Sequence, residues 1–593
     1  MIQNDEFGKS SKDKSRNLVN KSLLLAEYTF VLQVLLRVIT FALNGLTYRW
    51  LDADFLGLVN FRLALYYSTL VFMARESFRR ACLSRGGEIL FGNSSAADAC
   101  ANWRRLLNVM WLTVPTGALV SCVLLPIWIY LWPSPSVESV TSSTEHQYIV
   151  SCLIYTLSAM LELITEPMWL VCQLGLFVRS RIVLEATANI ARAVGVVVAV
   201  YYGPVATHGL YLLTCPQILH GTTLLLGYVF FAIWLVNRTQ REPDEPLDRI
   251  SLTSVSELLP NVHKFSLDWS CLFLSWSFFR QGILKQFLTE GERYLISAFH
   301  LLSFADQGIY DLVNNIGSLA PRLLFYPIEE SCHLLFSQCI QRELPPKQQN
   351  EVLLRQAMKM FRTSLRVVAL IAWLGFAFSQ AYSRLLLYFY GGSRLVNANP
   401  EAANLLRLFA LYLVLLAWNG PTEAFLGATM TAENVRRHSR CLAGFSVVFL
   451  GASWCLVPLC GAAGFILANC VNVLARIIYS CYFINRFVVS AEENHDYSPE
   501  TLAELRSFSL LQLMFPSRLQ TVVLVITLFV TLFSEYLCSA LTITQIFFHL
   551  IIGAGAFLAA SFVVLRQERA LFASLSETSL GRFLNRIYQI FSP

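Results

Sequence analysis

Long apolar runs of about 20 or more residues, separated by polar segments, dominate the chain between residues 23 and 565. A helix needs roughly 20 mostly apolar residues to cross about 30 Å of hydrocarbon, so each run predicts a membrane-spanning segment. Backbone polar groups in lipid must bond within their own segment, which predicts that all the runs are helices. The pattern therefore predicts an all-α, polytopic membrane protein of about fourteen transmembrane helices.

Two longer polar stretches divide these runs into groups of six, six and two. Prolines and acidic residues mark both stretches as connections outside the membrane. We expect an N-terminal tail at 1–22, a first lobe of six helices at 23–236, a linker at 237–264, a second lobe of six helices at 265–489, a linker at 490–519, two further helices at 520–566 and a C-terminal tail at 567–593. Duplicated halves are common in transporters, where the substrate site lies between the repeats.

Lysine and arginine are concentrated in alternate connections. Lysine and arginine recur in the N-terminal tail, the linker at 237–264 and the C-terminal tail, whereas segments 133–147 and 201–209 contain none. By the positive-inside rule both tails and both linkers lie in the cytosol. The net charge of +6 comes mostly from these loops, in a chain that is 55% hydrophobic and 14% charged, so no nucleic-acid partner is expected. An affinity of the same loops for acidic lipid head groups would produce the same bias.

The eighth predicted helix carries polar residues at offsets of 4, 3, 4 and 7, which share one helical face. They are Asp311, Asn315, Ser318, Arg322 and Glu329. Pro321 and Pro327 interrupt the same segment and predict a kinked or broken helix. Two interpretations remain open: a ladder of internal ion pairs, or the wall of a hydrophilic cavity.

Four cations fall inside other apolar runs: Arg37, Arg62, Arg280 and Lys285. A charge near the bilayer centre costs roughly 2.5 to 3.5 kcal/mol on insertion scales, so such residues normally face a bundle interior or a wet cavity. Facing one another across a cleft, they would suit a phosphate or pyrophosphate, whose oxygens guanidinium groups bind in pairs. Taken singly, each is explained as well by snorkelling or by a neighbouring carboxylate.

Glu162 and Glu166 stand one turn apart before Pro167 in the fourth predicted helix. Two like carboxylates at this spacing repel, so one is protonated or a cation lies between them. A proton or Na⁺ coupling site is one interpretation. A basic partner such as Arg192 is the simpler one.

The second predicted helix ends in a basic motif, ARESFRRACLSR at residues 74–85. Within it Glu76 is expected to pair with Arg79 and Arg80, while Arg75 and the other cations meet the cytosolic interface.

Short motifs that would indicate cofactor chemistry are missing from the sequence. It contains no G-x-x-x-x-G-K-[ST] nucleotide loop, and its nine histidines and fifteen cysteines show no metal-ligand spacing. No nucleophile, base and acid can be assembled on one side of the membrane. We therefore expect no cofactor, no metal, no nucleotide site and no enzymatic activity.

Three stretches of the sequence are long enough to be specific for a family. They are QVLLRVITF at residues 33–41, the segment from Gly57 through the basic motif at 74–85, and QGIYDLVNNIGSLAPRLLFYPIEES at 307–331. All three resemble the eukaryotic Rft family of endoplasmic reticulum membrane proteins. The likeness extends over nearly the whole chain, and segments 92–101 and 133–147 depart from it as ordinary loop variation. The matching motif positions include Arg37, Arg62, Arg75, Glu76, Arg79, Arg80, Asp311, Arg322, Glu329 and Glu330.

This resemblance implies the fold of the multidrug, oligosaccharidyl-lipid and polysaccharide exporter superfamily, with two six-helix lobes around a central cavity and two additional C-terminal helices. It implies a multi-pass protein of the endoplasmic reticulum. The implied function is translocation of Man5GlcNAc2-PP-dolichol from the cytosolic to the lumenal leaflet for protein N-glycosylation, so the implied partner is a lipid-linked oligosaccharide. A seven-sugar head group cannot cross hydrocarbon unaided, which fits a polar path through the protein.

Two other functions stay open at this stage. One is a non-transporting accessory or scaffold protein that supports the glycosylation machinery. The other is an ion-coupled small-molecule antiporter of the same fold, for which Glu162 and Glu166 are the candidate coupling residues.

Overall fold

The computed structural model describes residues 38–51, 53–91, 96–131, 142–175, 177–241, 254–260, 266–299, 302–342, 344–494, 497–538 and 542–569. Every regular element in these ranges is a helix. The predicted all-α class is therefore confirmed. Arg37, the predicted N-terminal tail and nearly all of the predicted C-terminal tail lie outside the described residues.

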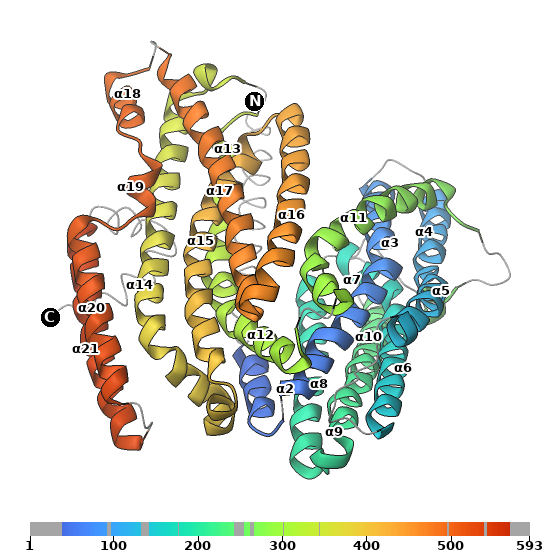
Figure 1. The fold of residues 1–593 in the computed structure, drawn as a ribbon. Coiled ribbons are helices and arrows are strands. Elements are labelled where there is room, and N and C mark those ends of the chain that lie inside the picture. Colours follow the sequence, from blue (N-terminus) through green and yellow to red (C-terminus); the bar gives the residue numbers. More distant parts are fainter. Residues whose placement is uncertain are drawn as a thin grey trace, which may run out of the picture. The chain divides into compact units, whose positions relative to one another are not determined.

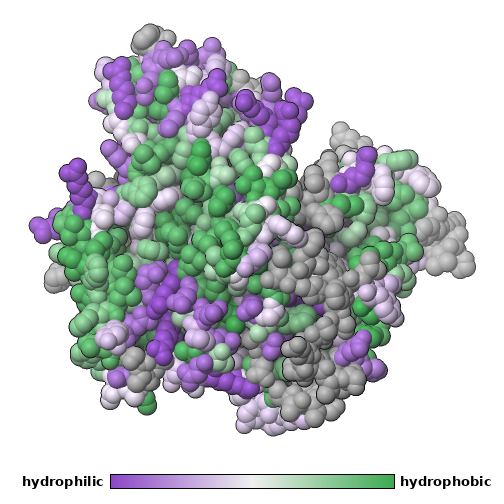
Figure 2. All heavy atoms as spheres, in the orientation of Figure 1, coloured by the Kyte–Doolittle hydropathy of each residue, from purple (hydrophilic) through white to green (hydrophobic). Residues whose placement is uncertain are grey.

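Eleven helices in the described part of the chain are long and apolar enough to cross a membrane, and a shorter apolar helix spans Val38–Tyr48. The chain is thus a multi-pass membrane protein. Figure 2 shows a broad apolar band over residues 301–593, with hydrophilic side chains gathered at the end that carries the short helix α18, Pro499–Arg506. The total of about fourteen spans stays a prediction.

Packing divides the chain into two compact units, residues 1–300 and 301–593. The first unit consists of α2 (Ala53–Leu56), η1 (Gly57–Leu63), α3 (Ala64–Phe91), α4 (Ala96–Trp111), α5 (Thr113–Pro126), η2 (Ile127–Leu131), α6 (Ser142–Ile164), α7 (Glu166–Leu174), α8 (Val178–Tyr202), α9 (Val205–Thr214), α10 (Pro216–Arg241), η3 (Val255–Leu258) and α11 (Trp269–Phe299). The elements η1 and η2 are π-helical, and η3 is a 3₁₀-helix.

The core of the first unit joins α3, α4, α7 and α10 around buried side chains such as Phe78, Met110, Trp169 and Tyr228. Helix α11 packs along α3 in the same unit (Figure 1). The sequence-based division differs here, because it opens the second lobe at residue 265 and so assigns α11 to that lobe. The boundaries of the two lobes stay a prediction.

The second unit consists of α12 (Phe304–Gly317), η4 (Pro321–Phe325), α13 (Tyr326–Cys339), η5 (Pro346–Gln348), α14 (Glu351–Ala398), α15 (Glu401–Thr429), α16 (Ala432–Cys460), α17 (Ala462–Glu492), α18, α19 (Leu510–Met514), α20 (Arg518–Leu537) and α21 (Ile543–Gln567). The element η4 is π-helical, and η5 is a 3₁₀-helix. Helix α14 bends at Gly392, whose φ of 77° and ψ of −177° suit only glycine.

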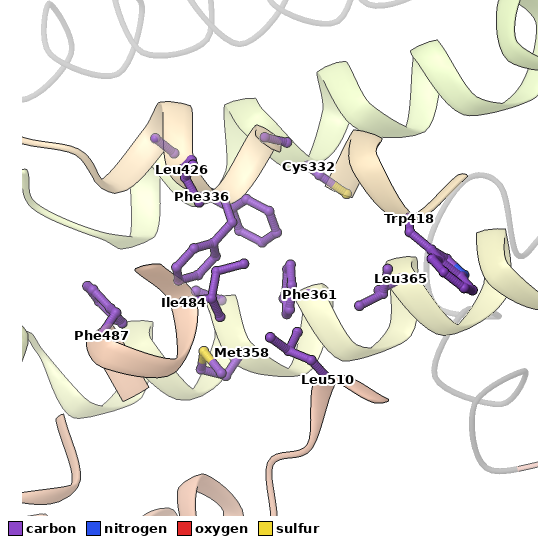
Figure 3. Close-up of a cluster of buried hydrophobic side chains, with 14 of the residues drawn as sticks. Cys332, Phe336, Met358, Phe361, Leu365, Trp418, Leu426, Ile484, Phe487 and Leu510 are labelled. Carbon is purple, nitrogen blue, oxygen red and sulfur yellow. The ribbon is translucent and has the colours of Figure 1, made fainter. Parts of the chain in front are cut away.

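The core of the second unit lies between α13, α14, α15 and α17 and contains a group of aromatic rings among its aliphatic side chains (Figure 3). The rings of Phe336, Phe361 and Phe425 stand 5.2 to 6.0 Å apart and tilt towards edge-on contact. Aromatic pairs in this geometry add about 0.5 to 1.5 kcal/mol each beyond the burial of their area. Three different helices are thereby fixed around one point.

Polar contacts attach the last two helices to the second unit, where α20 and α21 lie side by side along α14 (Figure 1). Buried Arg366 of α14 donates to Glu568 at 2.6 and 2.9 Å and to Gln520 at 3.0 Å. Arg407 of α15 pairs with Glu535 of α20 at 2.6 Å. These contacts hold the C-terminal helices to the unit through charge as well as through apolar packing.

Candidate functional site

A buried charge cluster in the first unit joins α3 to the junction of α6 and α7. Arg75 and Arg79 lie four residues apart on α3 and therefore share a face. The other side is built where the helix is interrupted: α6 ends at Ile164, and α7 begins at Glu166 with Pro167 in its first turn. This junction directs Glu162 and Glu166 to the same arginines.

The two arginines and two glutamates form a neutral network. Arg79 donates to Glu166 through Nε at 2.6 Å and through Nη2 at 2.8 Å, the paired geometry that guanidinium and carboxylate favour. Arg75 pairs with Glu162 and also approaches Glu166, at 3.4 Å. Tyr67 donates its hydroxyl to Glu162. The side chain of Glu166 is fully buried, so its charge depends on these partners.

Two pairings expected from the sequence are wrong. Glu76 pairs with Arg80 at 2.8 Å, as predicted, but Arg79 turns to Glu166, because that carboxylate lies across the helix interface and is buried. Arg192 is not the partner of the two glutamates. Its Nη1 donates to Gln217 at 3.3 Å, while Arg75 and Arg79 neutralise the glutamates from α3.

The aromatic ring of Trp169 completes this cluster. The guanidinium of Arg79 lies 3.8 Å from the ring centroid of Trp169 on α7, a cation–π contact that covers one face of the cation. The repulsion between Glu162 and Glu166 that the sequence predicted is thus relieved by two arginines. A coupling role for the two carboxylates stays a prediction.

Arg62 lies in the interior of the first unit and is only 2% exposed. It belongs to the π-helical η1, whose wider turn carries the side chain inward beneath Tyr148, with 5.1 Å between the guanidinium and the ring centroid. Trp128 donates its indole N–H to the backbone oxygen of Arg62 at 3.4 Å. Pyrophosphate binding by Arg62 stays a prediction.

The structure defines less well the other predicted intramembrane cations, two of which lie on α11. Arg280 is exposed on α11. Lys285 belongs to the same helix, but its side chain lies outside the described part of the structure, as does the whole of Arg37. The described residues therefore do not bring the four predicted cations into one site.

The eighth predicted helix is broken, as its prolines predicted. The regular α-helix α12 ends at Gly317, a π-helical turn runs from Pro321 to Phe325, and the chain continues directly into α13 at Tyr326, with Pro327 in its first turn. A π-turn takes more residues than an α-turn, so the 100° period does not continue across it. The prediction of one uninterrupted polar face is wrong for this reason.

The break distributes the predicted polar residues over three elements. Asp311 and Asn315 on α12 are half-buried, and Asp311 lies within electrostatic reach of Tyr390 on α14. Arg322 on η4 and Glu330 on α13 are exposed. Glu329 is half-buried against α15, where a Cβ added at Gly420 would stand 3.2 Å from its Oε2. These residues therefore meet different neighbours within the second unit.

Sequence reasoning missed a second charged group, in which Glu423 of α15 pairs with Arg476 of α17 at 2.5 Å. Asn419, one turn before Glu423, donates to the same carboxylate at 2.7 Å. Glu423 and Arg476 each interrupt an apolar run of the sequence. A charged residue inside an apolar run is also the pattern by which Arg37 and Arg62 are predicted as functional residues. Applied to every run, the same criterion would have found them.

The helices and their intramembrane charges define a multi-pass membrane protein, and its fold resembles that of a lipid flippase. The solved structure of lipid II flippase MurJ in its inward closed conformation superposes with a TM-score of 0.55 over 91% of this chain and 99% of that chain, at 12% identity. At this identity the likeness concerns the fold alone.

Sequence comparison then identifies the family. The model of the Rft protein family matches residues 21–578, so the chain belongs to the Rft family. It is 38% identical to the Man(5)GlcNAc(2)-PP-dolichol translocation protein RFT1 of Xenopus tropicalis over 80% of this chain and 84% of that protein. The proteins of the same name from Mus musculus and Drosophila melanogaster are 37% and 34% identical, over 80% and 83% of this chain and 83% and 88% of theirs.

Proposed function

We propose that this chain translocates Man5GlcNAc2-PP-dolichol from the cytosolic to the lumenal leaflet of the endoplasmic reticulum membrane. The observation that carries the proposal is its similarity, over most of its length, to relatives whose name states that activity. The flippase-like fold supports movement of a lipid-linked head group. On this proposal the lipid is moved unchanged, so the chain acts as a transporter and not as an enzyme.

The polar head group needs a path in which its hydroxyls and its pyrophosphate stay hydrogen-bonded. We propose that Arg37, Arg62, Arg280, Lys285 and Arg322 supply the cations of that path. Guanidinium groups are suited to this because each can bind two phosphate oxygens at once. Asp311, Asn315, Glu329 and Glu330 are proposed as its acceptors for sugar hydroxyls.

The proposed function also includes an orientation of the protein in the endoplasmic reticulum membrane. With both tails and the basic loops in the cytosol, the motif that contains Arg75, Glu76, Arg79 and Arg80 starts at the cytosolic end of α3 and is anchored inside the first unit by Glu166. Arg80, paired with Glu76 and about one third exposed, remains near the surface. The N-glycosylation machinery is a proposed partner.

Reconstitution of the purified full-length protein tests the proposal. Vesicles loaded symmetrically with Man5GlcNAc2-PP-dolichol are exposed to a mannose-binding lectin, which captures only the outward-facing head groups. We expect a second phase of capture that is absent from protein-free vesicles and from vesicles with an unrelated multi-pass protein. Capture that stops at the outer leaflet in all three would favour the accessory or scaffold function.

A further inference from the structure

Three helices of the second unit meet at a group of charges that does not sum to zero. Glu423 of α15 and Arg476 of α17 are paired at 2.5 Å, and Asn419 holds the same carboxylate at 2.7 Å. Glu329 approaches from α13 and lies against Gly420, where the missing side chain leaves room for its carboxylate, 3.2 Å from the position of a Cβ. Gly420 is three residues from Glu423, so both carboxylates lie on the same stretch of α15.

Glu329 lacks a compensating partner. Among the described residues its carboxylate makes no hydrogen bond and no ion pair, although it lies close enough to Glu423 and Arg476 to interact electrostatically with both. Arg476 already donates through its Nη2 to the carboxylate of Glu423. The site therefore contains two carboxylates and one guanidinium. When two carboxylates share a site, one of them binds a proton more readily than a free carboxyl group does. Of the two carboxylates, the unpartnered Glu329 is the one that is free to bind a proton.

Other titratable groups surround this site without neutralising Glu329. His438 of α16 lies near Glu423 and Arg476, while His333 of α13 faces Gly427 of α15. Cys332, three residues after Glu329, bonds to Ser364 of α14 at 3.1 Å, so α14 presents an uncharged group here. Both Cys332 and Trp418, which is next to Asn419, belong to the apolar cluster of Figure 3. Low polarity around the site strengthens the interaction between its charges.

An unmatched acceptor points to a proton as the missing component. Asn419 is 8% exposed, and its Oδ1 is buried without a hydrogen-bond partner in the described structure. A carboxylate offers acceptors only, whereas a protonated carboxyl group also offers a donor. Metal binding is less well supported, because the described residues contain no group of three or more His, Cys, Asp or Glu side chains that could hold an ion.

We propose that Glu329, Glu423, Asn419 and Arg476 form a proton-binding site in which Glu329 carries the proton and Glu423 remains ionised on Arg476. The proton is taken from water and returned to water, with no other bond made or broken. If the chain translocates lipid as proposed above, loading and unloading of this site would couple that movement to a proton gradient, and this last step rests on the proposed function.

Thermal stability of the purified full-length protein as a function of pH tests the site without any transport. A group that holds its proton more tightly in the folded state stabilises the fold at low pH, and this stabilisation is lost as the pH rises. Relative to Glu329→Gln, the folding equilibrium constant of the unmodified protein should therefore fall by up to about tenfold per pH unit over the range in which the unfolded chain has lost this proton and the folded protein still holds it. Glu330→Gln, on the same turn but exposed, should keep the unmodified profile.

Infrared spectroscopy supplies a second readout that does not depend on the stability of one variant. A carbonyl band of a protonated carboxyl group near neutral pH should be present in the unmodified protein and in Glu330→Gln and absent from Glu329→Gln. Parallel pH profiles of the unmodified protein and Glu329→Gln would overturn the proposal. So would stabilisation by Na⁺ at constant pH that disappears in Glu329→Gln, because it would identify a cation site. Either result leaves the vesicle experiment unaffected.

Discussion

Replacement of Glu166 by glutamine removes one charge from the cluster of the first unit while keeping its size. Glu166 is fully buried and accepts two hydrogen bonds from Arg79, at 2.6 and 2.8 Å. Removing one partner of a buried ion pair costs about 3 to 5 kcal/mol, because the other charge stays behind uncompensated. Arg79 and Arg75 are 18% and 23% exposed, so solvent reduces the loss to about 2 to 4 kcal/mol.

The assay is the free energy of unfolding of the purified protein in mixed micelles, measured by denaturant titration. Glu76→Gln provides a matched control on the same motif, because its partner Arg80 is on the same helix and both side chains are about one third exposed. Pairs of that kind contribute about 0 to 1 kcal/mol. We therefore expect Glu166→Gln to be clearly less stable than Glu76→Gln.

A double variant separates the ion pair from general damage to packing. When Arg79→Met and Glu166→Gln are combined, both charges of the pair are removed and neither is left uncompensated. The double variant should therefore lose less free energy of unfolding than the sum of the losses in the two single variants. Equal stabilities of Glu166→Gln and Glu76→Gln, or additive losses in the double variant, would refute the view that this cluster is held by its charges.

Two further variants test contacts at the other end of the chain. Arg366→Met removes the buried guanidinium that pairs with Glu568 and donates to Gln520, so we expect a loss of about 3 to 5 kcal/mol and faster hydrogen exchange in α20 and α21; unchanged exchange there would contradict it. The hydrogen bond and charge of Lys347 hold the pKa of Glu493 below its ordinary value of 4.5, so this pair stabilises the fold above that value and ceases to do so as the pH falls through the lowered pKa. Glu493→Gln should therefore reduce thermal stability at neutral pH, with a difference from the unmodified protein that disappears in acid; a constant difference would argue against it.

Local sequence patterns predicted the helical class and the break near Pro321, because both depend on neighbouring residues. Apolar length specifies a spanning helix by itself. A proline removes a backbone donor wherever it stands, so it predicts an interruption without knowledge of the fold. The path of the chain after the break was not predictable, because the π-helical turn from Pro321 to Phe325 changes the face on which later residues lie.

Partners of the charged residues required the tertiary fold. Glu162 lies 87 residues from Arg75, and Glu423 lies 53 residues from Arg476. Sequence spacing identifies pairs such as Glu76 and Arg80, which are one turn apart on a single helix. It does not reveal which distant helix presents the opposite charge, so the arginines of α3 could not be recognised as the partners of Glu162 and Glu166.

On the proposed function, the protein itself moves a pyrophosphate-linked glycolipid across a bilayer. The most direct test of this function is the fraction of Man5GlcNAc2-PP-dolichol that becomes accessible to an external lectin in vesicles containing only the purified protein. If the protein translocates the lipid, this fraction rises beyond the outer-leaflet share towards completion as the number of protein molecules per vesicle increases. A fraction that stays at the outer-leaflet share, as in protein-free vesicles, would contradict it.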